Sequence, residues 1–466
     1  MKRRWSVLLP YNKTVNINNL TDGPITRTLL TFAIPTLLSN VLQSLNGSIN
    51  TIWVGRFLGE SALAATANAN IITFLLFSLV FGFGMAATIM VGQSIGRKDL
   101  HQARRAFGAS IGFCLFLSVV LAVLGWLFSP QILQLLATPT DAFHLAEDYL
   151  RVVFIAAPAN LLMVMMMMGL RGAGDSLTPL IFMCVNVVLD IIFNPLLILG
   201  IWIFPKMGIA GAAASSSVSG YLALFAMVFY IYVKNLSLRL KGRELLYIWP
   251  DMKLTRFIIL KGFPMSLQMV IIATSGLVMI GLVNQEGVTT IAAYNIMQQL
   301  WTYLQMPSMA VGAAVSAMVA QNIGAGSWNR VSKTTLVGCV AAFVMIAILL
   351  GLLLVFDRPV IILFLGNESA AVATAQHIQA LASWSFLFFG LAMVLFSTVR
   401  ANGAVVVPLI CLFVATYPVR LGFYYAFYQK LHADAIWLSF TVGAFAALIM
   451  AVIYYYTGSW KKGKML

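Results

Sequence analysis

The sequence predicts an all-α integral membrane protein in which twelve transmembrane helices form two pseudo-symmetric six-helix bundles. Three observations favour this class: the composition, the spacing of apolar stretches and an internal repeat. Of 466 residues, 61% are hydrophobic and 9% are charged, which leaves too little polar surface to cover a soluble globule of this size. The apolar stretches carry Gly and Pro and do not alternate apolar with polar residues, so helices are expected rather than barrel strands.

The apolar stretches have the length of membrane spans. A helix of about 20 apolar residues crosses the hydrocarbon core of a bilayer, and short polar loops separate the stretches, so no large soluble domain is expected. The expected spans lie near 29–50, 66–90, 106–128, 151–169, 178–200, 208–232, 264–284, 290–318, 335–356, 378–399, 405–428 and 435–456.

The basic residues sort to one side of these spans. The net charge of +15 does not indicate nucleic-acid binding, because the lysines and arginines concentrate in the two tails and in alternate loops. This asymmetry is typical of cytoplasmic segments and predicts that both termini are cytoplasmic. The exceptions among the 29 lysines and arginines are Arg56, Arg151, Lys206, Arg358, Lys430 and Arg420.

An internal repeat divides the chain into two lobes. The segment 170–181 (LRGAGDSLTPLI) resembles 399–410 (VRANGAVVVPLI), and 91–96 (VGQSIG) resembles 319–324 (VAQNIG). We therefore expect an N-terminal lobe at 1–233, a cytoplasmic linker at 234–262 and a C-terminal lobe at 263–466. Parallel repeats of this kind place a central cavity at their interface, as alternating access requires.

One acidic residue, Asp190, falls near the middle of a span. A carboxylate at that depth must be neutralised, paired or solvated in a cavity, and such residues usually mark an ion or substrate pathway. Asn186 and Asn194 lie one turn on either side and share its face of the helix. Because no Lys or Arg falls inside the six spans of this lobe, apart from Arg151 at the very end of one, Asp190 is interpreted as a functional group.

Polar residues on two other spans are candidates to line the same pocket. Ser39, Gln43, Asn46 and Asn50 form a stripe along the first span that should face protein, and serines recur at 215–219 in the sixth. Such residues either line a cavity or join helices by hydrogen bonds, and the sequence leaves both interpretations open. Gln43, Asn46 and Asn194 are retained as substrate-cavity candidates.

Met165 and Arg420 are two further substrate-cavity candidates. Met165 begins a run of four methionines, which forms either a soft binding surface or ordinary packing. Arg420 is the other charge within a span, and its side chain either reaches toward the membrane surface or lines a cavity. No P-loop signature or metal-ligand histidine spacing is present. An enzyme is therefore not expected, and an ion gradient is the expected energy source.

With these motifs, the chain resembles the multidrug and toxic compound extrusion (MATE) family over nearly its full length. The resemblance implies a V-shaped pair of six-helix bundles that exports organic compounds in exchange for H⁺ or Na⁺. The segments that carry it are 49–65 (INTIWVGRFLGESALAA), 91–99 (VGQSIGRKD), 170–180 (LRGAGDSLTPL), 186–198 (NVVLDIIFNPLLI) and 208–219 (GIAGAAASSSVS).

The resemblance also implies a cation site in the N-terminal lobe. The similar bacterial branch uses an Asp on the first span, an Asn and an Asp on the fifth, and a Thr on the sixth. Here the fifth-span pair is Asn186 and Asp190, Asn50 replaces the first-span Asp, and Ser216 replaces the Thr. One carboxylate is enough to carry a proton, whereas Na⁺ benefits from more negative charge. The set therefore favours H⁺ over Na⁺, and no cofactor or other metal is expected.

We therefore expect a monomeric, multi-pass antiporter of the bacterial cytoplasmic (inner) membrane. Its partners would be a small organic substrate, drug-like or a metabolite, and the lipid bilayer. The main alternative is a flippase for lipid-linked precursors, which should hold more buried basic residues than Arg420 alone. A membrane-embedded enzyme or a passive channel is a second alternative, but one isolated Asp does not supply a pair of catalytic groups.

Overall fold

The computed structural model describes residues 19–463, and that part of the chain is all helical. Twelve of its helices are long and apolar enough to cross a membrane, which confirms the predicted fold class. Four basic residues of the N-terminal tail, and Lys464, lie outside the described residues. The N-terminal lobe consists of α1 (Ile25–Leu58), α2 (Glu60–Gly96), α3 (Leu100–Leu127), α4 (Ser129–Leu135), α5 (Thr140–Gly172), α6 (Leu177–Leu199) and α7 (Ile209–Val233).

The C-terminal lobe repeats this plan with two interrupted spans. One span breaks between α12 and α13, and another contains a π-helical segment, Ala415–Val419, that includes Pro418. A linker with a short 3₁₀ segment (Gly242–Ile248) joins the lobes. The lobe consists of α8 (Met252–Val283), α9 (Val288–Gly324), α10 (Trp328–Val355), α11 (Asp357–Leu365), α12 (Ala371–Ala382), α13 (Ser385–Arg400), α14 (Val406–Val414), α15 (Arg420–Leu431) and α16 (Asp434–Thr457).

Several helices are longer than the expected spans. Both α2 and α9 contain 37 residues, or roughly 55 Å at 1.5 Å per residue, against a hydrocarbon core of about 30 Å. The apolar stretches at 66–90 and 290–318 are therefore only the middle parts of these helices. Hydropathy detects the lipid-facing segment, whereas the helix continues where its polar residues meet water or protein.

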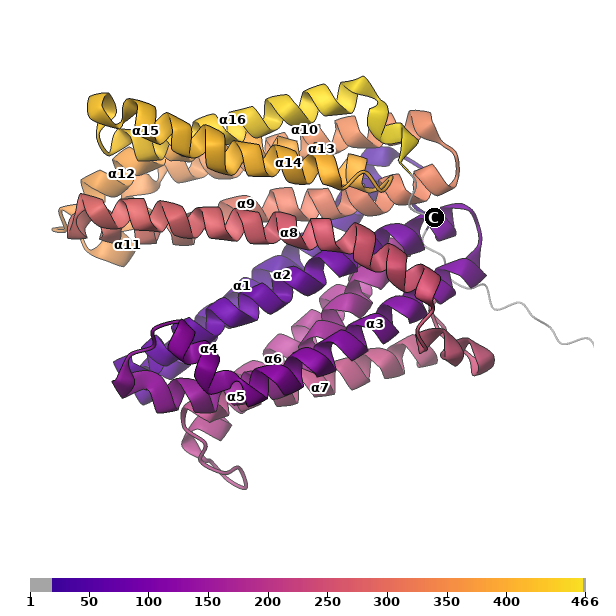
Figure 1. Cartoon of the computed structure of the whole chain (residues 1–466), viewed down its shortest axis with the longest axis horizontal. Helices are drawn as coiled ribbons and strands as arrows, with labels where there is room; N and C mark the ends of the chain where they lie inside the picture. Colours follow the sequence, from indigo (N-terminus) through magenta and orange to yellow (C-terminus); the bar gives the residue numbers. More distant parts are fainter. Residues whose placement is uncertain (1–18, 464–466) are drawn as a thin grey trace, which may run out of the picture.

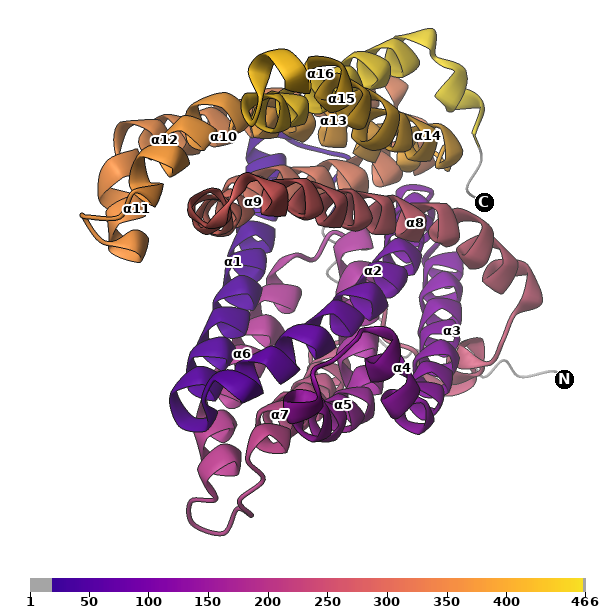
Figure 2. The same ribbon diagram turned by 60° about the vertical axis from the view of Figure 1, so that its left-hand side comes forward.

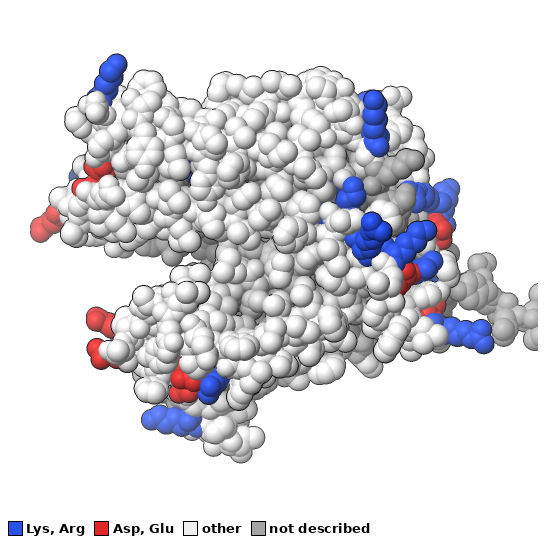
Figure 3. Space-filling model, in the orientation of Figure 1, with Lys and Arg blue, Asp and Glu red and all other residues white. Residues whose placement is uncertain are grey.

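The two lobes converge at one end and separate toward the other (Figures 1 and 2). Figure 3 shows the hollow between them and a concentration of Lys and Arg at the end where they meet. We call this the basic end; it contains the loops 97–99, 234–251 and 325–327. The contacts between the lobes are made mainly by α1 and α2 on one side and by α8 and α9 on the other.

The repeated motifs 91–96 and 319–324 contact each other at the basic end. A Cβ atom on Gly96 would lie 1.9 Å from the carbonyl oxygen of Gln321, and one on Gly324 would lie 2.1 Å from that of Gln93. Only glycine permits so close an approach of two helix backbones. The motifs that reveal the duplication therefore also join its two halves.

Two glutamines add a reciprocal pair of hydrogen bonds to this junction. Gln93 Nε2 donates to the carbonyl of Ala401 in the other lobe at 2.7 Å. Gln321 Nε2 donates back to the carbonyl of Gly172 at 3.1 Å. Both acceptors follow equivalent arginines of the repeat, so each lobe supplies the same donor and the same acceptor to its partner.

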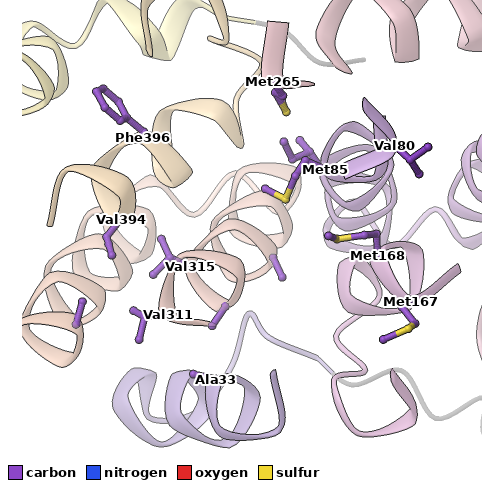
Figure 4. Packing of buried hydrophobic residues seen from close by; sticks show 14 of the residues in the cluster. Ala33, Val80, Met85, Met167, Met168, Met265, Val311, Val315, Val394 and Phe396 are labelled. Carbon is purple, nitrogen blue, oxygen red and sulfur yellow. The ribbon is translucent and has the colours of Figure 1, made fainter. Parts of the chain in front are cut away.

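Apolar packing continues from one lobe to the other around this junction. Figure 4 shows Met85 of the N-terminal lobe near Met265 of the C-terminal lobe, and Ala33 of the N-terminal lobe near Val311 of the C-terminal lobe. All four side chains belong to one buried cluster. The hollow at the opposite end is therefore closed off at the basic end by helix packing.

Candidate functional site

The candidate site is centred on Asp190, which α6 places against α1 and α7. Asn46 Nδ2 donates to Asp190 Oδ2 at 2.9 Å. Ser215 Oγ donates to Asp190 Oδ1 at 2.5 Å and also lies 2.9 Å from the backbone carbonyl of the same residue. Ser216 Oγ lies 3.4 Å from both carboxylate oxygens. Three helices of one lobe therefore converge on one carboxyl group.

The Asp190 side chain is buried without an opposite charge. The residue is 2% exposed, and no ion pair found between residues 19 and 463 includes it. Amide and hydroxyl donors satisfy a carboxylate only in part, and an unpaired charge is costly in this environment. The site is therefore suited to taking up a proton or another small cation.

Close packing of α6 on α7 holds the serines against Asp190. A Cβ atom on Gly211 would lie 2.6 Å from the carbonyl oxygen of Leu197, so this glycine lets the two helices approach. Ser215 lies one turn further along α7, with its hydroxyl directed to α6. The small residues of 211–217 thus serve both packing and the site.

A second group of polar side chains extends the site along α1 and α6. Asn194 Nδ2 donates to Asn50 Oδ1 at 2.7 Å, and Asn50 also forms a side-chain hydrogen bond with Tyr149 of α5. The Oδ1 atoms of Asn186 and Asn194 are buried without a hydrogen-bond partner. These two amide oxygens are free acceptors on the helix that carries Asp190.

The structure thus brings together most of the residues expected at the coupling site, but the α1 residue that contacts the carboxylate is not the expected one. Asn46, predicted for the substrate cavity, contacts Asp190 directly, whereas Asn50 contacts Asn194 and Tyr149. Ser216 lies beside the carboxylate. Asn186 shares its helix, but no hydrogen bond joins the two side chains in the described structure.

Three expected cavity residues lie elsewhere. Gln43 is exposed on α1, so the stripe of the first span is not wholly covered by protein. Met165 is 1% exposed and belongs to the apolar core; the methionine run provides packing at this position. Arg420 borders a cavity of the other lobe.

Sequence reasoning included Ser215 only as one of a run of candidate serines, and it did not include Tyr149. Ser215 was visible as part of a serine run, but only the rotation of α7 determines which hydroxyl reaches the carboxylate. Tyr149 carries no motif, and its position follows from the packing of α5 against α2 and α7. Among the described residues, no group of three His, Cys, Asp or Glu side chains that could hold a metal ion is found.

Two six-helix lobes around a hollow, with a buried carboxyl group in one of them, define a polytopic membrane transporter. The family model described as MatE matches residues 35–196 and 264–426, and the chain belongs to this family of transporters, whose members are not enzymes.

Relatives and solved structures agree with this assignment. The chain is 33% identical to the probable multidrug resistance protein YoeA of Bacillus subtilis, over 94% of each chain. It is 29% identical to the probable multidrug resistance protein YpnP of the same organism, over 96% of this chain and 98% of the relative. A structure described as the outward-facing conformation of a multidrug resistance MATE family transporter matches its fold with a TM-score of 0.86 at 19% identity, covering 97% of this chain and all of the other.

Proposed function

We propose that this transporter is a secondary antiporter that exports small organic compounds in exchange for H⁺, with Asp190 as the coupling carboxylate. The observation that carries the proposal is the burial of Asp190 among neutral donors only, with no ion-pair partner in the described part of the chain. A permanently paired carboxylate would be structural, whereas an unpaired one changes its charge state when it binds a cation.

Coupling would follow if the cation at Asp190 and the substrate stabilise different states of the two lobes. When the hollow faces the cytoplasm, the carboxylate is deprotonated and a substrate enters. When the hollow faces outward, a proton neutralises Asp190 and changes its hydrogen bonds to α1 and α7. The substrate then binds less tightly and leaves, because coupling requires that each ligand disfavour the bound state of the other.

The distribution of basic residues supports an orientation with the basic end in the cytoplasm. Both termini would then be cytoplasmic, and the structure would represent an outward-open state. We place the protein in the cytoplasmic (inner) membrane of a bacterium as a monomer, in keeping with its bacterial relatives. This orientation matches the export direction implied by relatives named for multidrug resistance.

The choice of ion rests on charge. The site offers one carboxylate and several neutral oxygens, which suffices for a proton, whereas Na⁺ gains more from a second negative charge. The unpartnered Oδ1 atoms of Asn186 and Asn194 are the groups that would complete an oxygen shell if Na⁺ were the coupling ion instead.

Transport into proteoliposomes under separately imposed pH and Na⁺ gradients tests the proposal. Two aromatic dyes of opposite charge, ethidium and fluorescein, serve as probes because the natural substrate is unidentified. Wild type should move at least one dye in response to the pH gradient, and Asp190→Asn should lose that response. Asp141→Asn is the matched control, because Asp141 is an exposed acid in the first turn of α5.

Two results would contradict the proposal in different ways. Gradient-driven transport by Asp190→Asn equal to wild type would remove Asp190 from coupling. A response to Na⁺ alone would keep the carboxylate but reject the proton. The flippase alternative is not favoured by the relatives, which are named as multidrug transporters.

A further inference from the structure

The C-terminal lobe contains a charged site of its own, formed around Arg420. Arg420 is the first residue of α15 and directly follows the π-helical segment Ala415–Val419. Such segments are rare and occur often at functional sites, because the extra residue per turn redirects the side chains that follow. Here the guanidinium borders a cavity of about 210 Å³ among α8, α9, α13 and α16.

Protein groups satisfy this guanidinium only in part. Its Nη1 donates to Ser275 Oγ at 3.0 Å, and its central carbon lies 4.7 Å from the centre of the Phe440 ring. Its Nε is buried without a hydrogen-bond partner. Arginine presents five N–H donors in a planar fork, so this side chain retains donor capacity.

No negative charge between residues 19 and 463 pairs with Arg420. None of the residues that line the cavity is acidic, and no ion pair in the described ranges includes Arg420. Three acidic side chains of this lobe are hydrogen-bonded elsewhere: Glu286 to Tyr428, Asp357 to Gln376, and Asp434 to His377.

Arg400 of the same lobe is a buried arginine whose guanidinium is fully hydrogen-bonded to the protein, as expected for a structural role. Its Nε, Nη1 and Nη2 donate to the Phe396 carbonyl, Gln268 Oε1 and Ser397 Oγ, at 3.2, 2.9 and 3.1 Å. Every nitrogen of that guanidinium is bound to a protein oxygen. Arg420 leaves its Nε unpartnered, as do Arg151, Arg171, Arg239 and Arg330, but Arg420 is the one of these five that lines this cavity.

The remaining walls of the cavity are aromatic or neutral. Tyr294, Trp301, Phe386, Phe389 and Phe440 surround the space, and Gln298, Thr302 and Gln305 add uncharged hydrogen-bonding groups. Rings of this kind stack on a planar ligand, while an arginine fork recognises a carboxylate or phosphate.

We propose that this cavity binds the anionic head of an aromatic substrate, with Arg420 as the group that recognises the carboxylate or phosphate. This inference rests on the proposed export function and assigns its substrate class as an amphipathic organic anion. Gly443 of α16 packs closely against the π-helical segment before Arg420, because a Cβ atom there would lie 2.9 Å from the Ala415 carbonyl oxygen.

Equilibrium binding to the full-length protein in nanodiscs tests this site without any ion gradient. The probes are 1-naphthoate and 1-naphthyl phosphate, with 1-naphthylmethylammonium as a cation that carries the same ring. Wild type should bind the two anions saturably and more tightly than the cation. Arg420→Gln should weaken anion binding at least about tenfold, because it removes the charged partner of a desolvated anion.

Three variants separate recognition from loss of fold. Arg420→Lys should retain part of the affinity, since it keeps the charge but loses the planar fork. Gly443→Ala should weaken anion binding while retaining Arg420, because the added methyl group presses on the Ala415 carbonyl and shifts the π-helical segment that positions Arg420. Arg358→Gln, which changes an exposed arginine in α11, should bind as wild type does.

The outcomes also separate this proposal from the coupling proposal. Asp190→Asn should still bind the naphthyl anions saturably and more tightly than the cation, since the Arg420 cavity lies in the other lobe. The anion site is overturned if wild type shows no saturable binding of either anion. It is equally overturned if folded Arg420→Gln binds the anions as tightly as wild type, or if wild type prefers the cation. Normal anion binding with absent gradient-driven transport would reject only the coupling proposal.

Discussion

A single methyl group at the junction of the lobes should shift the balance between the two facing states. In Gly324→Ala the new Cβ would lie 2.1 Å from the carbonyl oxygen of Gln93, whereas an ordinary contact requires at least 3.4 Å. The helix backbones must therefore separate by about 1.3 Å at this point, and the packing of α2 on α9 at the basic end must loosen.

The size of the change in the closed-to-open ratio follows from the free-energy cost of overpacking. Extra volume in a well-packed interior costs about 1–3 kcal/mol, and about 1.4 kcal/mol changes a population ratio tenfold. If the contact exists only while the basic end is closed, the ratio of closed to open molecules should fall by roughly 5- to 150-fold. Gly96→Ala, which presses on the Gln321 carbonyl, should act in the same direction.

Distance measurements between spin labels at Lys98 and Asn329 check this prediction. Both positions are exposed at the basic end and belong to different lobes, so opening separates them. A background without the four cysteines is required. In Gly324→Ala a longer-distance population should grow relative to wild type. The matched control is Gly351→Ala in α10, where the added Cβ meets nothing within 4 Å. Identical distance distributions for wild type and Gly324→Ala would refute the role assigned to this contact.

Three further predictions concern single contacts. Ser215→Ala should reduce proton-driven transport several-fold more than Ser216→Ala in the proteoliposome assay, because Asp190 Oδ1 lies 2.5 Å from one hydroxyl and 3.4 Å from the other; equal losses would contradict this ranking. Exchanging Gln93 and Gln321 for leucine should give a non-additive double-mutant cycle in the spin-label assay, since their hydrogen bonds join the same two surfaces; strict additivity would show that they act independently. Burial opposes the ionisation of Asp251, but hydrogen bonds from Arg105 and the backbone amides of Leu254 and Lys253 outweigh it and lower the pKa of this carboxyl group. The resulting stabilisation is present at neutral pH and is lost as the pH falls below about 4, so the apparent melting temperatures of wild type and Asp251→Asn should differ slightly at pH 7 and converge in acid; a constant difference would contradict the pH dependence.

The overall architecture was predictable because the bilayer restricts the structures that can cross it. Long apolar stretches must become helices, and the similarity of 91–96 to 319–324 required two equivalent halves. Helix ends and interruptions were less visible. The break between α12 and α13 and the π-helical segment before Arg420 lie inside the single predicted spans 378–399 and 405–428, and hydropathy does not locate them.

The candidate site was predictable as a neighbourhood but not as a set of contacts. Asp190 stood out because a charge in a span is costly, and the i+4 spacing correctly placed Asn194 on its face. Asn46 and Asn50 share one face of α1, so only the height at which α1 crosses α6 determines that Asn46 reaches the carboxylate. For the same reason the serine run could not identify Ser215. Such choices depend on helix rotation and translation, which pattern alone does not determine.

The placement of the two buried charges bears on how the lobes can move. The groups that contact Asp190 come from α1 and α7, and those that contact Arg420 come from α8 and α16. Each charge is therefore held entirely within its own lobe. An ion pair between the lobes would have to break at every cycle, and separating a buried pair costs several kcal/mol. Neither charge depends on the relative position of the lobes. The interactions that oppose separation of the lobes are therefore the glycine contacts and the glutamine hydrogen bonds at the basic end. Ligands bound near Asp190 or Arg420 can then shift the equilibrium between the closed and open states only through helices that lead from these sites to the junction. Two helices, α1 and α8, each contact one of the charges and also the opposite lobe.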